Sequence, residues 1–286
     1  MSRQDPAPPT GQDWEDPFEI DTSVAHAARR YNYWLGGTDN FEADRISGDA
    51  VLATFPTTRI FAIENRRFLR RAVTYLAEQA GIRQFLDIGT GIPSADNVHE
   101  VAQAIDPKAR VVYVDNDPIV LAHARKLLSN TPDGGATAYI HADLRDPDTI
   151  LDHPDLHATL DLDKPVGLML ISVVPFLTDA DDPHGKVARL TGALAPGSHL
   201  AMSHGTTDFL PAEAAAVIEA MARREAARSR ESGQFRDRAA IARFFDGMEL
   251  VPPGIVALPD WRSELPPAQR PSAADVSNYS AVARIR

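Results

Sequence analysis

The sequence predicts an α/β protein built on one doubly wound, mostly parallel sheet, and three observations support this fold class. Short apolar runs of strand length alternate with longer stretches that carry apolar residues at the spacing of a helix face. The run at residues 165–172 is almost wholly apolar, as expected for a central parallel strand buried on both faces. A glycine-rich turn, Gly89-Thr90-Gly91, joins the first run to a helical pattern, as in nucleotide-binding βαβ units. The runs that we assign to strands are residues 84–87, 110–114, 137–140, 165–172, 199–203, 249–251 and 277–284.

The composition limits the class of protein. A chain of 286 residues with 44% hydrophobic residues can bury a full core in one large domain. No apolar run approaches the roughly 18–20 residues of a membrane span, and no signal pattern opens the chain, so we expect a cytoplasmic protein without a membrane partner. The absence of cysteine excludes disulfides and thiolate chemistry. The formal net charge of -11 disfavours nucleic acid as a partner, because such binders present a basic face.

The domain organisation follows from the same patterns. Residues 1–20 are rich in Pro, Asp and Gln with little apolar periodicity, which predicts a disordered tail. Residues 21–286 are expected to form a single domain, with a helical cap at 21–81 and a ligand-binding core at 82–286. The cap is predicted to hold three helices: one from the capping cluster Asp21-Thr22-Ser23 to Gly36, one from near Asn40 that Gly48 can interrupt, and one from Thr58 to Gly81.

Aromatic and amide side chains gather in the cap between residues 31 and 41. Tyr33, Trp34 and Asn40 lie in this segment. One interpretation is a helix–loop–helix whose aromatic rings pack on the sheet. The other is a lid over the ligand pocket, lined by rings and amides. The sequence favours neither.

Acidic residues follow three successive predicted strands. Asp87 ends the first strand, Asp115 the second, and Asp143 follows the third. Because the carboxyl ends of parallel strands share one edge of the sheet, these acids should face the same pocket, and Asp115 lies about 20 residues beyond the glycines, where a carboxylate can accept hydrogen bonds from ribose hydroxyls. The alternative is that each acid only caps the next helix.

Histidines offer weaker candidates for chemistry. His204 ends the fifth predicted strand, where it could act as a general base or as a hydrogen-bonded supporting residue. His153 and His157 fall in a polar stretch around Pro154, so we interpret them as solvated loop residues and expect no metal site.

The details of the turn discriminate between nucleoside cofactors. A dinucleotide-binding turn needs a third glycine, but Ser94 stands in its place, and no Gly-Lys-Ser or Gly-Lys-Thr of a P-loop follows. Asp87 beside the glycines would repel a pyrophosphate, whereas it suits a cofactor that carries a sulfonium and an ammonium. The set of three acids and two glycines therefore favours S-adenosylmethionine over NAD.

Beyond these features, the chain resembles the actinobacterial S-adenosyl methyltransferase family, once catalogued as a domain of unknown function, a branch of the class I methyltransferases. The resemblance extends from about Asp21 to the C-terminus. It rests on the blocks 31–45, 65–69, 85–100, 111–118, 141–147 and 194–204. It implies a Rossmann-like, seven-stranded sheet with a C-terminal antiparallel hairpin and an N-terminal helical cap.

The resemblance also implies roles for individual residues. By analogy with class I methyltransferases, Gly89, Thr90 and Gly91 would follow the methionine part of the cofactor. Asp115 would hold the ribose and Asn116 would lie beside the adenine. The remaining assignments are Asp143 and Leu144 at the adenine amino edge and Ser172 under the sulfonium. The sequence departs from the family in two places, with Pro93 where many class I enzymes have a third glycine and Val174-Pro175-Phe176 where Leu-His-Phe is expected.

These observations support a methyltransferase that acts on a small-molecule acceptor by in-line transfer from the sulfonium, without a metal. Two alternatives remain open: a catalytically silent protein that binds S-adenosylmethionine or S-adenosylhomocysteine, and, less favoured, an NAD-dependent oxidoreductase. The acceptor and the oligomeric state are not predicted. Six residues are candidates for lining the acceptor pocket: Tyr33, Trp34, Asn40, Asn65, Arg66 and His204. Of these, Tyr33 is a second candidate for catalysis beside His204.

Overall fold

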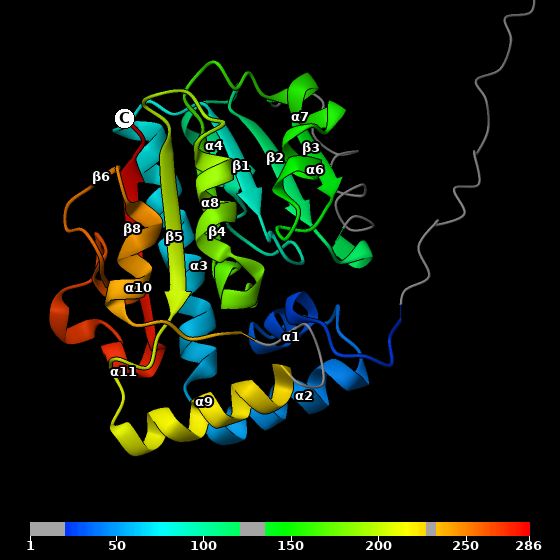
Figure 1. Cartoon of the computed structure of the whole chain (residues 1–286), viewed down its shortest axis with the longest axis vertical. Helices are drawn as coiled ribbons and strands as arrows, with labels where there is room; N and C mark the ends of the chain where they lie inside the picture. Colours follow the sequence, from blue (N-terminus) through cyan, green and yellow to red (C-terminus); the bar gives the residue numbers. More distant parts are fainter. Residues whose placement is uncertain (1–20, 121–134, 227–232) are drawn as a thin grey trace, which may run out of the picture.

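One mostly parallel sheet runs through the protein (Figure 1). The computed structural model describes residues 21–120, 135–226 and 233–286, so the predicted tail at 1–20 lies outside the described residues. Within these ranges the sheet has eight strands in the order β3-β2-β1-β4-β5-β8-β6, and β7 pairs with β8. The strands are β1 (Gln84–Ile88), β2 (Arg110–Asp115), β3 (Thr137–His141), β4 (Gly167–Ile171), β5 (His199–Gly205), β6 (Glu249–Leu250), β7 (Val256–Ala257) and β8 (Asn278–Arg284).

The pairing confirms the predicted doubly wound sheet. Strands β1 to β5 pair in parallel, whereas β8 is antiparallel to β5, β6 and β7. The adjacent antiparallel strands β6 and β8 confirm the expected C-terminal hairpin. The sheet has one strand more than predicted, because the two residues of β7 are too few to give a periodic pattern.

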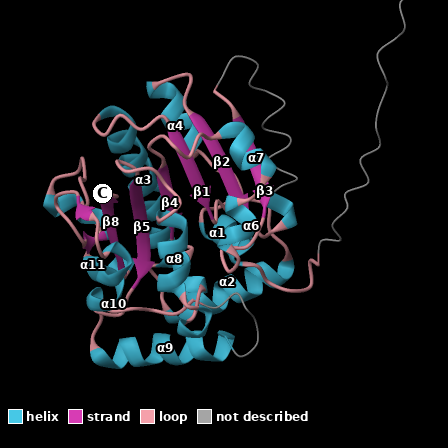
Figure 2. Ribbon diagram, turned by 45° about the horizontal axis from the view of Figure 1, so that its top comes forward, coloured by secondary structure: helices cyan, strands magenta, loops and turns pink. Residues whose placement is uncertain are grey.

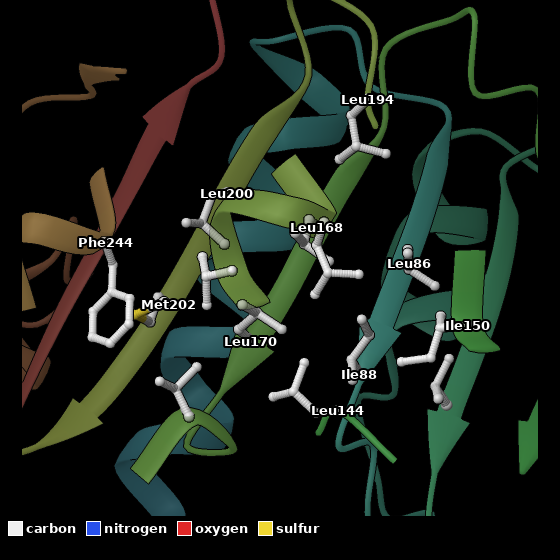
Figure 3. Packing of buried hydrophobic residues seen from close by; sticks show 14 of the residues in the cluster. Leu86, Ile88, Leu144, Ile150, Leu168, Leu170, Leu194, Leu200, Met202 and Phe244 are labelled. Carbon is white, nitrogen blue, oxygen red and sulfur yellow. The ribbon is translucent and has the colours of Figure 1, made fainter. Parts of the chain in front are cut away.

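Helices cover both faces of the sheet and form its two cores. On one face, alternate residues of the strands pack under α6, α7, α8 and α10, as Figure 3 shows for Leu86, Leu168 and Leu200. On the other face, Phe85 and Met169 pack against α3, α4 and Trp261.

The helices differ in length and position (Figure 2). Figures 1 and 2 place α1, α2 and α9 beyond the carboxyl ends of the parallel strands. Among the described helices, none combines the length and apolar character that a bilayer span requires. The α-helices are α1 (Ala27–Trp34), α2 (Glu42–Thr54), α3 (Thr58–Glu78), α4 (Val98–Ile105), α6 (Pro147–Leu151), α7 (Pro154–Thr159), α8 (Pro183–Thr191), α9 (Ala212–Ala226), α10 (Arg238–Ala242) and α11 (Ala273–Val276).

Three local predictions need correction. Helix α1 begins after His26, whose imidazole accepts a hydrogen bond from the Ala28 amide, and not at the Asp21-Thr22-Ser23 cluster. Helix α2 continues through Gly48, because a Cβ there would lie 2.8 Å from the ring of Tyr33 and the glycine lets α1 and α2 pack closely. The polar stretch around Pro154 is helix α7, and His153 caps it by accepting from the Asp155 amide at 3.2 Å.

Candidate functional site

A cavity of about 320 Å³ opens at the carboxyl edge of the sheet, and we call it the carboxyl-edge cavity. Its wall combines the ends of β1, β2 and β4, the loop after β3, the cap helices α1, α2 and α3, and part of α9. Parallel strands all end at this edge, so the topology brings together residues that are far apart in the sequence. All nine residues predicted to bind the cofactor line the cavity: Asp87, Gly89, Thr90, Gly91, Asp115, Asn116, Asp143, Leu144 and Ser172.

The glycine turn has the backbone that its sequence predicts. Gly89 and Gly91 adopt φ values of +75° and +68°, in the region that favours glycine. A Cβ on Gly89 would lie 2.3 Å from Val173, whereas a Cβ on Gly91 would meet no atom within 4 Å. Gly89 is therefore required by packing, and Gly91 leaves open space in the cavity wall.

Asp87 is a carboxylate buried in the cavity wall, with 4% of its surface exposed. No arginine, lysine or histidine in the described parts of the chain forms an ion pair with it. Burial raises the pKa of Asp87 to about 7, and the Arg66 guanidinium opposes this only in part. Bringing a cation into the cavity would stabilise the ionised form of this side chain.

Asp115 organises the turn as well as lining the cavity. Its Oδ2 accepts from the Gly91 amide at 2.7 Å, and its Oδ1 accepts from the Asp117 amide at 2.9 Å. Desolvation raises the pKa of Asp115, and these two amide hydrogen bonds oppose the rise. Each carboxylate oxygen keeps a second lone pair for a ligand hydroxyl.

Asp143 and Asn116 form the adjoining part of the wall. The Asn116 amide donates to Asp143 at 3.1 Å, and Arg145 pairs with the same oxygen at 2.9 Å. Asp143 also accepts from the Arg145 backbone amide, which lies in the loop before α6, and the N-cap of that helix is Asp146 instead. Because both Asp115 and Asp143 line the cavity, capping alone does not account for either residue.

A chain of hydrogen bonds runs from Ser172 behind the cavity. Ser172 has φ +55°, an uncommon value for a residue with a side chain, and its Oγ lies 3.1 Å from Ser203 Oγ. Ser203 donates to Asn65 Oδ1 at 2.7 Å, and Asn65 donates to the Tyr31 hydroxyl at 3.1 Å. The Tyr31 hydroxyl in turn donates to the Ala62 carbonyl at 2.8 Å. Because Ser203 uses its hydrogen for Asn65, Ser172 donates to Ser203 and presents only lone pairs elsewhere.

The cap supplies part of the cavity wall, as the lid interpretation predicted, but through fewer residues. Trp34, Asn65 and Arg66 line the cavity. Tyr33 and Asn40 do not, and we correct their assignment as lining residues. The hydroxyl of Tyr33 donates to Asp49 on α2 at 2.7 Å, and Asn40 bonds within its loop to Asn32 and Gly37. Both side chains join parts of the cap to each other.

His204 also lies outside the cavity wall, and its assignment as a pocket residue is corrected. It is completely buried, its Nδ1 donates to the Gly205 carbonyl, and its Nε2 accepts from Arg236 at 3.0 Å. Burial lowers the pKa of His204 to about 3, and the Arg236 charge adds to this effect. The imidazole is thus a neutral acceptor that holds a buried arginine.

Comparisons with known proteins agree with this geometry. The model of the S-adenosyl methyltransferase family matches residues 13–286. A DUF574 family protein from Streptomyces avermitilis is 47% identical, covers 94% of this chain and 100% of its own, and superposes with a TM-score of 0.87. A protein from Thermobifida fusca is 39% identical over 96% of this chain and 99% of its own, with a TM-score of 0.83. No curated protein matches.

This chain belongs to the S-adenosyl methyltransferase family. The resemblance seen in the sequence is therefore confirmed. In this S-adenosyl methyltransferase family member, Pro175 lies at the cavity wall in the one-turn helix at Val174–Phe176, and its carbonyl accepts from the Gln234 amide at 2.7 Å. The residue that departs from the expected histidine thus fixes the loop that carries Gln234 and Phe235 against the cavity.

Sequence patterns do not reveal the residues that attach the cap to the sheet. Asp117 is buried and pairs with Arg29 of α1 through both carboxylate oxygens, at 2.9 and 3.1 Å. His26 lies 3.2 Å from the same carboxylate. An acid two residues after Asp115 was the only signal, and it does not reveal the partner, which lies 88 residues away in the chain. Within the described residues, no group of three or more His, Asp or Glu side chains could hold a metal ion.

Proposed function

We propose that this protein is an S-adenosylmethionine-dependent methyltransferase that acts on a small, largely apolar molecule. The observation that carries the proposal is Asp87, a buried carboxylate without a cationic partner among the described residues, beside a glycine turn at the carboxyl edge of the sheet. A buried carboxylate is costly unless a ligand pairs with it. The family assignment supports the same cofactor.

The residues present fit this cofactor. Asp87 suits the ammonium of the methionine part, because it is acidic, enclosed and unpaired. Gly91 leaves the space that the backbone needs to approach a ligand. Asp115 has free lone pairs for ribose hydroxyls, and Asn116, Asp143 and Leu144 form the wall that we assign to the adenine. When bound, S-adenosylmethionine supplies an electrophilic methyl group on a sulfonium.

The rest of the cavity defines the class of acceptor. Beyond the polar wall it is lined by apolar side chains that come from the cap, α9 and the loop before α10. Such a surface excludes water and holds an apolar molecule by burial of its surface. The acidic net charge of the chain supports a small molecule over nucleic acid. These apolar residues include Trp34, Phe55, Phe61, Leu69, Met221 and Phe235.

This arrangement can position the methyl acceptor. It does not offer His204 as a general base. His204 is neutral, fully bonded and outside the cavity wall. Ser172 presents lone pairs at the end of β4 and can hold an acceptor N–H or O–H in a fixed orientation. A base is needed only where the attacking atom carries its proton at neutral pH.

Calorimetric titration with S-adenosylmethionine, S-adenosylhomocysteine and NAD tests the cofactor. Binding of the first two without NAD is the expected result, and a ligand at about 100 times its Kd should stabilise the fold by roughly 2.7 kcal/mol. Asp87→Asn should abolish most of this binding, whereas Tyr33→Phe, outside the cavity wall, should not change it. Binding of NAD, or of none of the three, would contradict the proposal.

A screen of small apolar amines, phenols and carboxylic acids with labelled cofactor then tests methyl transfer. Turnover of one acceptor, lost in Ser172→Ala, is expected. Cofactor binding without turnover of any acceptor would favour the second candidate, a silent cofactor-binding protein, for which the Pro175 departure is the specific observation.

A further inference from the structure

A second cavity, of about 830 Å³, lies at the opposite edge of the sheet. It is formed where β1, β2, β4 and β5 begin and where the antiparallel strand β8 ends, and we call it the amino-edge cavity. In Figure 1 this edge lies at the top, away from α1, α2 and α9. Its volume falls in the range of about 300–1,000 Å³ that is usual for small-molecule sites. No residue lines both cavities.

The amino-edge cavity is strongly cationic in a protein whose net charge is -11. Asp106 is the only carboxylate among the residues that line it, against five arginines and lysines. These cations come from segments that are distant in sequence and meet only through the sheet. They are Arg83, Lys108, Arg110, Lys164 and Arg284.

Two of the five cations already have partners. Arg83 pairs with Asp106 at 2.7 Å and donates to the Ala77 and Ile82 carbonyls near the end of α3, where a cation is favoured by the helix dipole. Lys164 pairs with Asp161 at 2.7 Å. These contacts explain both residues without a ligand.

The other three cations are less fully paired. Within the described ranges, Lys108, Arg110 and Arg284 form no ion pair at 4 Å or less. Arg110 donates to the Thr159 carbonyl at 3.5 Å and interacts electrostatically with Asp161, and Arg284 stands opposite Glu249 in the pairing of β6 with β8. Arg110 and Arg284 are strand residues, so they do not neutralise a helix end. Like charges held around one cavity repel each other, and an anion between them would relieve that repulsion.

The cavity is preformed. Gln84 fixes the loop that carries Lys164 by bonding the carbonyl and amide of Asp161, at 3.0 and 2.7 Å. Gly197 and Ser198 exchange two backbone hydrogen bonds with Ile285, at 2.9 and 2.7 Å, and so hold the end of β8 that carries Arg284. A ligand would therefore pay little to order the walls.

The wall also has an apolar part. The ring of Tyr75 lines the cavity together with Pro165 and Pro196. His199 lies edge-on to Tyr75 with a centroid separation of 6.5 Å, and its Nδ1 is buried without a hydrogen-bond partner among the described residues. A ring or other apolar group could pack against Tyr75 while its charged end faces the cations.

We propose that the amino-edge cavity binds a phosphate-bearing small molecule. Guanidinium groups bind phosphate through paired hydrogen bonds, and a lysine adds a compact charge, so Arg110, Arg284 and Lys108 match this chemistry better than that of a neutral ligand. The proposal does not depend on the proposed methyltransferase function, because the two cavities share no residue.

Calorimetric titration of the full chain with pyrophosphate and with phenyl phosphate tests the proposal. Saturating S-adenosylhomocysteine is present in one series so that the carboxyl-edge cavity cannot supply the signal. We expect binding in both series, weakened at least tenfold by Arg110→Gln or Arg284→Gln and unchanged by Arg223→Gln, an exposed cation on α9 that lines neither cavity. Tighter pyrophosphate binding would identify an inorganic ligand, and tighter phenyl phosphate binding an organic ester packed on Tyr75.

If neither pyrophosphate nor phenyl phosphate binds, the proposal is overturned. Equal weakening in Arg223→Gln, or no weakening in Arg110→Gln and Arg284→Gln, would overturn it as well, because binding would then reflect net charge alone. Thermal unfolding without ligand checks that each variant folds. If a strand variant does not fold, Lys108→Gln, in the exposed turn before β2, replaces it and should also weaken binding at least tenfold.

Discussion

The two edges of the sheet differ in charge although the same strands build both. At the carboxyl edge, the strand ends deliver Asp87, Asp115 and Asp143 to a cavity of about 320 Å³. At the amino edge, residues at or before the starts of β1, β2 and β4 and at the end of β8 deliver arginines and lysines to a cavity of about 830 Å³. Strand direction thus separates charge in this protein, and the two proposed ligand sites, one for a cation and one for an anion, lie at opposite edges of one sheet.

The largest change in the free energy of unfolding should come from substitution of Asp87 at the carboxyl edge. Its pKa of about 7 lies above the usual 3.8, so the unfolded state loses this proton first and stability falls as pH rises from about 4 to about 7. Asp87→Asn removes this loss. At about pH 8 without ligand, urea unfolding should show the variant more stable by up to about 4 kcal/mol, at about 1.4 kcal/mol per pKa unit.

The same substitution should weaken binding of S-adenosylmethionine at least tenfold, because the carboxylate that pairs with a cation is gone. Stability and affinity should therefore change in opposite directions. A ligand-free variant that is less stable than the parent at about pH 8 would show that Asp87 has a structural partner instead. Asp246→Asn, at an exposed residue, is the matched control and should change neither quantity.

Replacing a glycine at either edge should change the free energy of unfolding less than replacing Asp87, and by different amounts at the two edges. Gly89→Ala should cost roughly 3 kcal/mol, because a left-handed φ is combined with a contact of 2.3 Å to Val173. Gly81→Ala, at the amino-edge cavity, has a similar φ of +71° but meets no atom within 4 Å, so about 1 kcal/mol is expected. Urea unfolding of both variants measures the difference, and equal losses would rule out the Val173 contact as its cause.

Substitution of His204 should lower the free energy of unfolding by about 1–3 kcal/mol without changing cofactor binding in the carboxyl-edge cavity. His204→Phe leaves the buried Arg236 without the acceptor at 3.0 Å, and unsatisfied donors cost this much. Cofactor affinity should change less than twofold in calorimetry. A full loss of methyl transfer with unchanged stability, together with a rate that titrates near pH 6–7, would restore His204 as a base.

The smallest effect is expected for the amino-edge cations in the absence of anions. Arg284→Gln removes an exposed charge that forms no ion pair among the described residues, so stability should change by no more than about 0.5 kcal/mol. The affinity for S-adenosylmethionine should stay within about twofold. A larger change in that affinity would show that the two edges are coupled through the strands.

Much of the fold and of the carboxyl edge could be predicted from the sequence, because both depend on local patterns. Apolar runs predicted seven of the eight described strands, and acids that directly follow strands predicted where Asp87, Asp115 and Asp143 lie. The amino edge carried a signal of the same kind, since Arg83, Arg110, Lys164 and His199 stand at or just before strands.

The rest depended on tertiary contacts that no local pattern encodes. Tyr33 and Asn40 are expected in the pocket, but Tyr33 packs against Gly48 and bonds to Asp49 of α2, and Asn40 bonds to Asn32 and to the Gly37 carbonyl. His204 stands at the correct end of β5 and still misses the cavity, because Arg236, 32 residues later, occupies its free nitrogen. Whether α1 begins at Ser23 or Ala27 was likewise decided by distant partners, since Asp44 of α2 accepts from the His26 amide.

The position of β8 between β5 and β6 has a consequence for the protein's synthesis on the ribosome. Strand β5 ends at Gly205, and its partner β8 begins only at Asn278. At about 5–20 residues per second, the roughly 70 intervening residues take on the order of 4–14 s to translate. During that interval β5 has an open edge that is rich in apolar residues, a form prone to pair with another chain. The nascent chain is therefore the state in which a chaperone would matter most.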